Sequence, residues 1–175
     1  MFEVNVLGTV AVTQSVLPLI RASKGRIVCT SSIAGREGIP TQAAYCASKH
    51  AVQGYADVLR KDMYPWGVTV HIVEPGVFPA TGLYERFQTG LDHVWDRLDP
   101  KVKADYGEDH KNFIRKLLGF ALHVLGTKDS SLVPKAYVHA VLDTKPMYRY
   151  RVGWDSKYLF TMLHNCHEST VDAVM

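Results

Sequence analysis

Cysteine is scarce in this 175-residue sequence, which has only Cys29, Cys46 and Cys166. Three widely spaced cysteines do not make a disulfide framework, so we expect free thiols that pack as small apolar side chains. An excess of charge of one sign is also lacking, because 20 Lys and Arg residues against 17 Asp and Glu residues leave a net charge of +3. This weak excess argues against a nucleic-acid-binding protein.

Long apolar runs are scarce as well. The segment 1–20 is rich in Val, Leu and Ala, but polar residues interrupt it. The basic residues Arg21, Lys24 and Arg26 follow this segment, whereas a secretory signal has its basic residues first. We therefore predict a buried helix over 2–22, and no membrane-spanning helix.

What the sequence does contain is enough apolar side chain for a core. Hydrophobic residues make up 47% and charged residues 21%, which predicts one compact domain over 1–175. Helical and strand patterns alternate along it. The predicted strands are 26–31, 68–73 and 148–154. Continuous helices are predicted over 2–22, 41–64, 109–125 and 156–165, and a broken helix over 84–106. Thr41 is the predicted cap of the second helix, and Ser130 or Ser131 caps a further helix that ends at Leu142.

This alternation predicts an α/β fold with a doubly wound parallel sheet and helices on both faces. Such sheets bind ligands beyond the carboxyl ends of their strands. Ser31-Ser32 and Pro75-Gly76 directly follow two predicted strands, so a site is expected there.

Tyr45 and Lys49 are the first candidates for chemistry, because a spacing of four puts both on one face of a helix. An adjacent ammonium favours the phenolate form of a tyrosine, which can then exchange a proton with an alcohol oxygen. An ordinary pair on a helix surface has the same spacing, so the pair alone leaves both interpretations open.

Ser32 and Asn5 are the second pair of candidates. A Ser32 hydroxyl just after a strand can hydrogen-bond a substrate oxygen, although a serine there also serves as a turn or helix cap. Asn5 lies in an apolar helix, where a buried amide needs a partner. It either supports a proton relay to the lysine or is a structural amide.

Four motifs occur in order: Asn5-Val6-Leu7-Gly8, Gly25-Arg26-Ile27-Val28 leading to Ser31-Ser32, Tyr45-Cys46-Ala47-Ser48-Lys49-His50-Ala51, and Glu74-Pro75-Gly76. Together they resemble the short-chain dehydrogenase/reductase superfamily. Later segments, including Trp95-Asp96-Arg97-Leu98 and Tyr148 to Lys157, are similar to its retinol dehydrogenase and hydroxysteroid dehydrogenase branch.

The resemblance implies reversible hydride transfer between NAD or NADP and an apolar alcohol or ketone. It implies Tyr45 as general acid and base, Lys49 beside it and on the nicotinamide ribose, Ser32 on the substrate oxygen and Asn5 in the proton relay. It also implies that Pro75, Gly76, Val77 and Thr81 contact the cofactor, with the threonine one position later than usual. A homodimer and an endoplasmic reticulum membrane-associated or cytoplasmic location are further expectations from the family.

The glycine-rich turn that cradles the cofactor's pyrophosphate in this superfamily has no counterpart in the sequence. We therefore expect the C-terminal catalytic part of a dehydrogenase fold. The alternative is a catalytically inactive fragment that acts at most as an interaction module through the helices 2–22 and 41–64.

Two weaker candidates complete the sequence-based expectations. His164, Cys166 and His167 lack an evident fourth ligand, so no metal site is predicted. The amphipathic segment 113–125 is either a core helix or a lid over an apolar substrate pocket that rests on a membrane surface.

Overall fold

The computed structural model describes residues 1–166 and 169. The chain divides into two compact units, which are described separately below. The first comprises Met1–Gly76 together with Ser131–Met175, and the second comprises Val77–Ser130.

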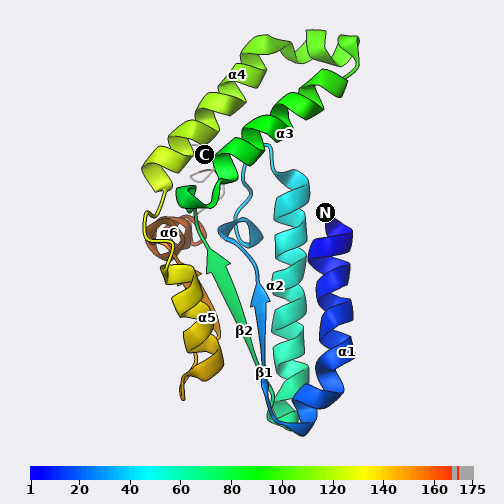
Figure 1. Cartoon of the computed structure of the whole chain (residues 1–175), viewed down its shortest axis with the longest axis vertical. Coiled ribbons are helices and arrows are strands. Elements are labelled where there is room, and N and C mark those ends of the chain that lie inside the picture. Colours follow the sequence, from blue (N-terminus) through cyan, green and yellow to red (C-terminus); the bar gives the residue numbers. More distant parts are fainter. Residues whose placement is uncertain (167–168, 170–175) are drawn as a thin grey trace. The chain divides into compact units, whose positions relative to one another are not determined.

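A three-stranded parallel sheet forms the centre of the first unit (Figure 1). Its strands are β1 (Arg26–Thr30), β2 (Thr69–Pro75) and β3 (Arg149–Val152), in the order β1-β2-β3. Val28 pairs with His71, and Val73 pairs with Tyr150. The predicted parallel α/β architecture is therefore confirmed, and β2 runs two residues further than the predicted strand, through Glu74 and Pro75.

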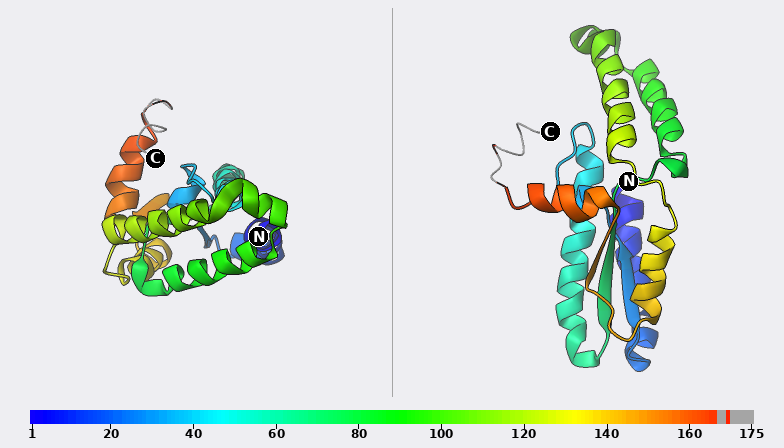
Figure 2. Two further views of the ribbon diagram at one scale, coloured as in Figure 1. Left: turned by 90° about the horizontal axis from the view of Figure 1, so that it is seen from above. Right: turned by 90° about the vertical axis from the view of Figure 1, so that its left-hand side faces the viewer.

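Helices lie on both faces of this sheet, and α2 and α5 cover opposite faces (Figure 2). The helical elements of the first unit are η1 (Glu3–Gly8), α1 (Thr9–Ala22), η2 (Ile33–Gly35), α2 (Ala43–Met63), η3 (Tyr64–Trp66), α5 (Leu132–Leu142), η5 (Asp155–Leu159) and α6 (Phe160–Leu163). Thr41 is not the cap of α2, because Gln42 precedes its first residue and Thr41 has a left-handed φ of 69°.

The core of the first unit lies between α2 and the sheet. Val52, Ala56 and Leu59 are spaced three and four residues apart on α2, so they face β1 and β2 from one side of the helix. Val70 and Ile72 alternate on β2 and are almost fully buried. This packing fixes α2, and therefore the two candidate residues near its amino end, against the sheet.

The helical segment formed by η1 and α1 differs from the predicted buried helix. Val4 is 77% exposed, Val12 65% and Leu19 73%, because α1 packs against α2 and β1 along one side only. By length and composition, Glu3–Ala22 is apolar enough to cross a membrane, a property that signal sequences and buried core helices share. The prediction of a helix over 2–22 is confirmed, and the prediction that it is buried is wrong for the described chain.

The second unit is a helical hairpin of α3 (Leu83–Arg97) and α4 (Pro100–Leu125), preceded by η4 (Pro79–Thr81). Asp92 of α3 forms ion pairs with Lys111 and Arg115 of α4, and Trp95 donates a hydrogen bond to Glu108. Gly107, with a φ of 75°, kinks α4 where the sequence predicted a break between helices. Phe113 and Phe120 are exposed, and the membrane role of 113–125 stays a prediction.

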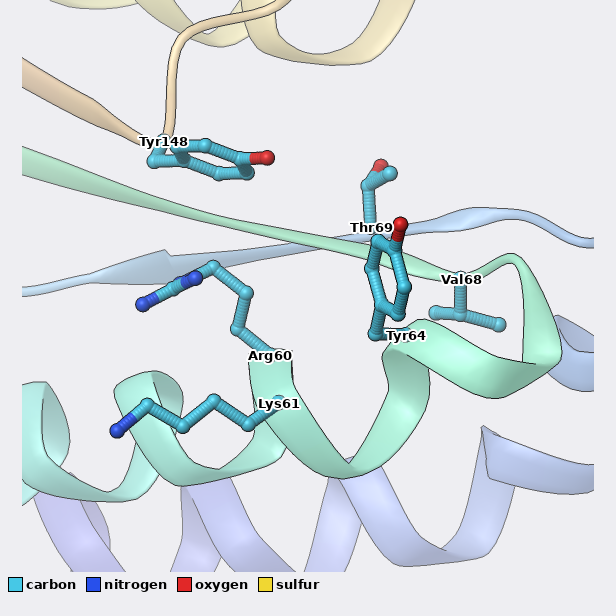
Figure 3. A pocket seen from close by; sticks show the side chains of 6 residues that line it. All are labelled: Arg60, Lys61, Tyr64, Val68, Thr69 and Tyr148. Carbon is cyan, nitrogen blue, oxygen red and sulfur yellow. The ribbon is translucent and has the colours of Figure 1, made fainter.

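His71 is a buried polar side chain in the middle of β2. Its Nδ1 lies 2.7 Å from the Met147 carbonyl oxygen, and its Nε2 lies 2.9 Å from the hydroxyl of Thr69, which Figure 3 shows at the amino end of the sheet. Burial lowers the pKa of His71, the hydrogen bond to Met147 opposes this shift, and Arg26 adds to it. The folded chain therefore holds this histidine in its neutral form more strongly than the unfolded chain does.

The protein is expected to become less stable as the pH is lowered, because of this histidine. In the unfolded chain the imidazole takes up a proton near pH 6.5, whereas in the folded chain burial keeps His71 neutral to a lower pH. The free energy of unfolding therefore decreases as the pH falls below about 6.5. Urea unfolding of the wild type and of His71→Gln at pH 7.5, 6.5 and 5.5 checks this. The variant should lose less stability across the range, and equal pH dependence in both proteins would contradict the assignment.

Candidate active site

The turns after β1 and β2 lie together at the carboxyl edge of the sheet, as the sequence predicted. The Ser31 N–H donates to the Val73 carbonyl at 2.8 Å, and the Gly76 N–H donates to the Val152 carbonyl at 2.8 Å. The strand hydrogen bonding thus continues one residue past β1 and β2. This fixes the starting points of both turns relative to each other.

The amino-terminal half of α2 brings Tyr45, Ser48 and Lys49 to this edge. Ser48 is fully buried and donates to the Tyr45 carbonyl at 2.7 Å. It also accepts a hydrogen bond from the Asn5 side-chain amide at 3.1 Å. The amide of Asn5 is therefore held against α2 within one helical turn of Tyr45 and Lys49, and Ser48 is a partner that sequence reasoning missed.

Lys49 is half-buried and points along β1. Its Nζ donates to the Thr30 carbonyl at 3.1 Å and lies 5.8 Å from the centroid of the Tyr45 ring. Burial lowers the pKa of this amine. Within the described residues no carboxylate pairs with it, so its charge acts on the neighbouring carbonyl and phenol ring instead.

Ser32 directly follows the buried Ser31. Its Oγ accepts a hydrogen bond from the Ala34 N–H at 3.3 Å, so it caps η2, as one of the two sequence interpretations expected. An oxygen that accepts from a backbone N–H keeps its own proton for a second partner. The cap therefore leaves the predicted contact of Ser32 with a substrate oxygen chemically open.

A close approach of backbones sets the distance between η2 and α2. The Ser31 hydroxyl donates to the Lys49 carbonyl at 3.2 Å. A Cβ atom at Gly35 would lie 2.8 Å from the same carbonyl oxygen, which is closer than real Cβ contacts allow. Glycine at position 35 thus lets the turn that carries Ser32 pack directly on the turn of α2 that carries Lys49.

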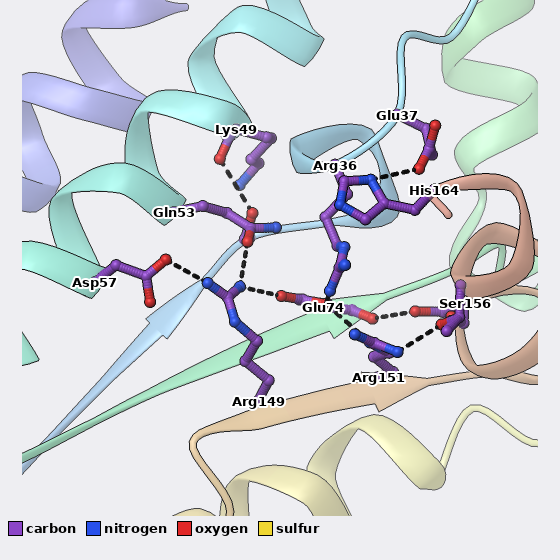
Figure 4. Close-up of polar contacts among 12 residues, drawn as sticks. Arg36, Glu37, Lys49, Gln53, Asp57, Glu74, Arg149, Arg151, Ser156 and His164 are labelled. Atoms are coloured by element: carbon purple, nitrogen blue, oxygen red, sulfur yellow. Dashed lines mark hydrogen bonds and ion pairs between the residues drawn. The ribbon is translucent and has the colours of Figure 1, made fainter. Parts of the chain in front are cut away.

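A buried carboxylate lies under the site and was not singled out as a charged centre from the sequence. Glu74 is 1% exposed, and Arg149 contacts its Oε1 at 2.6 Å (Figure 4). Arg36 and Arg151 each lie 3.8 Å from its Oε2. Glu74 thus joins the loop after Ser32 to β2 and β3.

Arg149 extends this network to α2, where it hydrogen-bonds the side chains of Gln53 and Asp57 (Figure 4). These two residues lie one and two turns beyond Lys49 on the same helix. The sequence signal for such a network was a glutamate and two arginines inside strands, where charged side chains are rare unless they are paired.

Pro75 and Gly76, two of the predicted cofactor-binding residues, end β2 and begin the next turn. A Cβ atom at Gly76 would overlap the carboxylate of Asp155, which is fully buried. Val77 and Thr81 belong to the second unit, where the Val77 carbonyl accepts from the Thr127 N–H at 2.8 Å and Thr81 ends η4. Their role at the cofactor stays a prediction.

A groove of about 660 Å³ runs along the free edge of β1. Asn5, Thr9 and Thr13 line it from the helical side, and Thr30 and Lys49 line it at the carboxyl end of the strand. The structure therefore brings Asn5 and Lys49 to one groove.

The predicted absence of a metal site concerns His164, Cys166 and His167. His164 contacts Glu37 at 2.9 Å, whereas His167 lies outside the described residues. The described part of the chain shows no group of three potential metal ligands.

Comparison with known proteins identifies the family. Residues 1–91 match the family model for short chain dehydrogenases. The chain belongs to the short-chain dehydrogenase family. Over 99% of its length it resembles a structure of a short-chain dehydrogenase from Streptomyces avermitilis, with a TM-score of 0.63 and 21% identity, and it covers 56% of that chain.

Curated relatives place the chain in the predicted branch of this family. It is 38% identical to human retinol dehydrogenase 16 over 99% of its own length and 54% of the relative. It is 34% identical to human 17-beta-hydroxysteroid dehydrogenase type 6 over 100% of its own length and 55% of the relative. It is also 43% identical to the mitochondrial D-beta-hydroxybutyrate dehydrogenase of Rattus norvegicus over 85% of its own length and 44% of the relative. The chain thus spans about half the length of the curated relatives it matches.

Gly35→Ala is expected to lower the free energy of unfolding by about 1–3 kcal/mol, because the added methyl group must push η2 away from α2. Gly38→Ala is the matched control, since a Cβ atom there meets nothing within 4 Å. Urea unfolding of both variants measures the difference. Equal stabilities of the two variants would show that the turn tolerates a side chain at position 35.

Proposed function

We propose that this chain carries the proton-transfer half of an NAD- or NADP-dependent alcohol dehydrogenase of the short-chain type. The observation that carries the proposal is the joint placement of Asn5, Tyr45 and Lys49 around the start of α2, beside the Ser31-Ser32 turn. Family membership supports it. On this proposal both units belong to one catalytic domain over 1–175.

Each of these residues has a defined task in the proposed reaction. Tyr45 takes the proton from an alcohol oxygen during oxidation and returns it during reduction. Lys49, a cation that has lost part of its solvation, stabilises negative charge on the neighbouring phenol oxygen. Ser32 donates its hydroxyl proton to the substrate oxygen and orients it. Asn5 supports the proton relay to Lys49, and its hydrogen bond to Ser48 holds it against this turn of α2.

The residues of the chain fit only one end of a nicotinamide dinucleotide. Lys49 and Tyr45 offer donors that suit ribose hydroxyl groups, and Pro75, Gly76, Val77 and Thr81 are the proposed nicotinamide contacts. Pyrophosphate binding requires backbone amides at a helix amino terminus, and the sequence lacks the glycine-rich turn that provides them. When bound, the cofactor accepts or supplies the hydride.

The proposed substrate is a small apolar alcohol or ketone. The names of the relatives support this class, because they include enzymes for retinol and hydroxysteroids. The hydroxybutyrate dehydrogenases extend it to a short hydroxy acid. An endoplasmic reticulum membrane-associated or cytoplasmic location, with 113–125 resting on the membrane surface, belongs to the same proposal.

Tyr45→Phe is expected to lower kcat at least a hundredfold while leaving the Kd for NADH nearly unchanged, because only the proton-transferring hydroxyl is removed. The measurements are NADH production with a panel of retinol, a 3-hydroxysteroid and 3-hydroxybutyrate, and NADH binding by fluorescence quenching. Tyr55→Phe, ten residues further along α2, is the control. A Tyr45→Phe variant with more than a tenth of wild-type turnover would remove Tyr45 from its role.

A second candidate function is an interaction module, and the exposed apolar side of η1 and α1 favours it. Val4, Leu7, Val12 and Leu19 are all more than 60% exposed, beside a groove along the unpaired edge of β1. Exposed apolar surfaces of this kind mark protein or membrane contacts. Homodimerisation through α1 and α2 is the form of contact that we propose.

Val12→Lys is expected to convert a dimer to a monomer in sedimentation velocity, because a charge would be buried in the contact. Val94→Lys on α3, where the valine is 58% exposed, is the matched control and should leave the dimer intact. A wild-type chain that sediments as a monomer would refute the dimer.

Saturable micromolar NADH binding by the chain itself would count against the alternative that it is a catalytically inactive fragment.

A further inference from the structure

A pocket of about 300 Å³ lies at the amino ends of the strands, at the opposite end of the sheet from Ser32 and Gly76. Its lining comes from three parts of the first unit: the end of α2 with η3, the start of β2, and the residue before β3. The lining residues are Arg60, Lys61, Tyr64, Val68, Thr69 and Tyr148. The proposed dehydrogenase reaction uses none of them.

The two cations of this pocket have little negative charge to neutralise them. Arg60 lies 3.9 Å from Asp57, but the other oxygen of that carboxylate is bound by Arg149. Lys61 is exposed, and it pairs with no carboxylate among residues 1–166. The side chains of Arg60 and Lys61 extend toward the same side of the pocket in Figure 3. This side therefore attracts an anion.

Apart from Thr69, the rest of the pocket is apolar and aromatic. Tyr148 lies over Arg60, with 5.0 Å between the guanidinium carbon and the ring centroid, and is 59% exposed. Tyr64, 81% exposed, and Val68 lie on the other side of the pocket in Figure 3. The Tyr148 ring also stacks with His71, so its exposed part and the exposed Tyr64 ring are the aromatic surface that a flat apolar group can contact.

The buried histidine below the pocket decides what Thr69 can offer to a ligand. A carbonyl oxygen only accepts, so neutral His71 must carry its proton on Nδ1 to bond the Met147 carbonyl. Its Nε2 then accepts, and the Thr69 hydroxyl donates to it. Thr69 therefore presents oxygen lone pairs, which disfavour an anion at its end of the pocket and leave Arg60 and Lys61 as the anion site.

We propose that this pocket binds a small amphipathic acid, with its anionic group on Arg60 and Lys61 and its flat apolar body against Tyr148, Tyr64 and Val68. A volume of 300 Å³ equals about ten water molecules in the liquid, which suits an aryl or short-chain acid rather than a long lipid. The proposal does not depend on the dehydrogenase activity, because every residue involved lies at the other end of the sheet.

The test titrates the chain with 2-naphthoate and with its neutral analogue 2-naphthamide by isothermal titration calorimetry. Saturable binding of the naphthoate, with at least tenfold weaker binding of the amide, is the expected result. Arg60→Gln and Tyr148→Leu should each weaken naphthoate binding at least fivefold. Equal binding of acid and amide, or unchanged binding by Arg60→Gln, would overturn the proposal.

Lys157 and Tyr158 provide the matched control. The Nζ of Lys157 lies 5.4 Å from the centroid of the Tyr158 ring, and both side chains are exposed, but they do not line this pocket. Lys157→Gln and Tyr158→Leu should bind naphthoate like the wild type. An equal loss in these variants would show that any exposed cation beside an aromatic ring binds the probe.

A lipid head group is a second source of the same anionic chemistry, and vesicle sedimentation distinguishes it. Vesicles of phosphatidylcholine with 30% phosphatidylserine should neither sediment the wild-type protein nor displace naphthoate from Arg60 and Lys61. Binding of the wild type to these vesicles that is lost in Arg60→Gln, together with displacement of naphthoate by them, would overturn the small-acid proposal and assign the pocket to the membrane.

Discussion

The geometry of the carboxyl edge depends on the ion pairs of the buried Glu74 carboxylate. Its partners are Arg36, in the loop after Ser32, and Arg149 and Arg151, in β3. Arg149 also hydrogen-bonds Gln53 and Asp57 on α2. Three elements that carry or support the proposed site thus share one charge network. Removing one partner of such a network leaves uncompensated buried charge, which typically costs about 3–5 kcal/mol.

The proposed chemistry and the proposed acid pocket lie at opposite ends of the same helix and sheet. Parallel strands place all their carboxyl ends at one edge and all their amino ends at the other. Lys49, near the start of α2, reaches the first edge, and Arg60, near its end, lies at the second. A ligand at the second edge would contact α2 and Tyr148, and the next residue, Arg149, binds both Asp57 of α2 and Glu74.

The exposed side of α1 and the groove beside β1 are surfaces that such a fold normally covers. In the described chain, β1 is an edge strand and α1 has an apolar side that packs against little else. Parallel sheets are normally covered on both faces and extended by further strands. The uncovered apolar side of α1 and the unpaired edge of β1 are therefore the surfaces of the described chain most suited to a further packing partner.

Apolar periodicity and short motifs are local properties of the chain, so they predicted the three strands, the main helices, their parallel arrangement and the family without any coordinates. The sequence placed Tyr45 and Lys49 on one helical face for the same reason. Tertiary packing sets the hydrogen bond of Asn5 to Ser48, the three arginines around Glu74, the contact of Asp155 with Gly76 and the exposure of the apolar side of α1. These contacts join residues that are far apart in the sequence, 43 positions for Asn5 and Ser48 and 75 positions for Glu74 and Arg149. The exposure of α1 depends on which surfaces leave it uncovered, and no local pattern encodes either property.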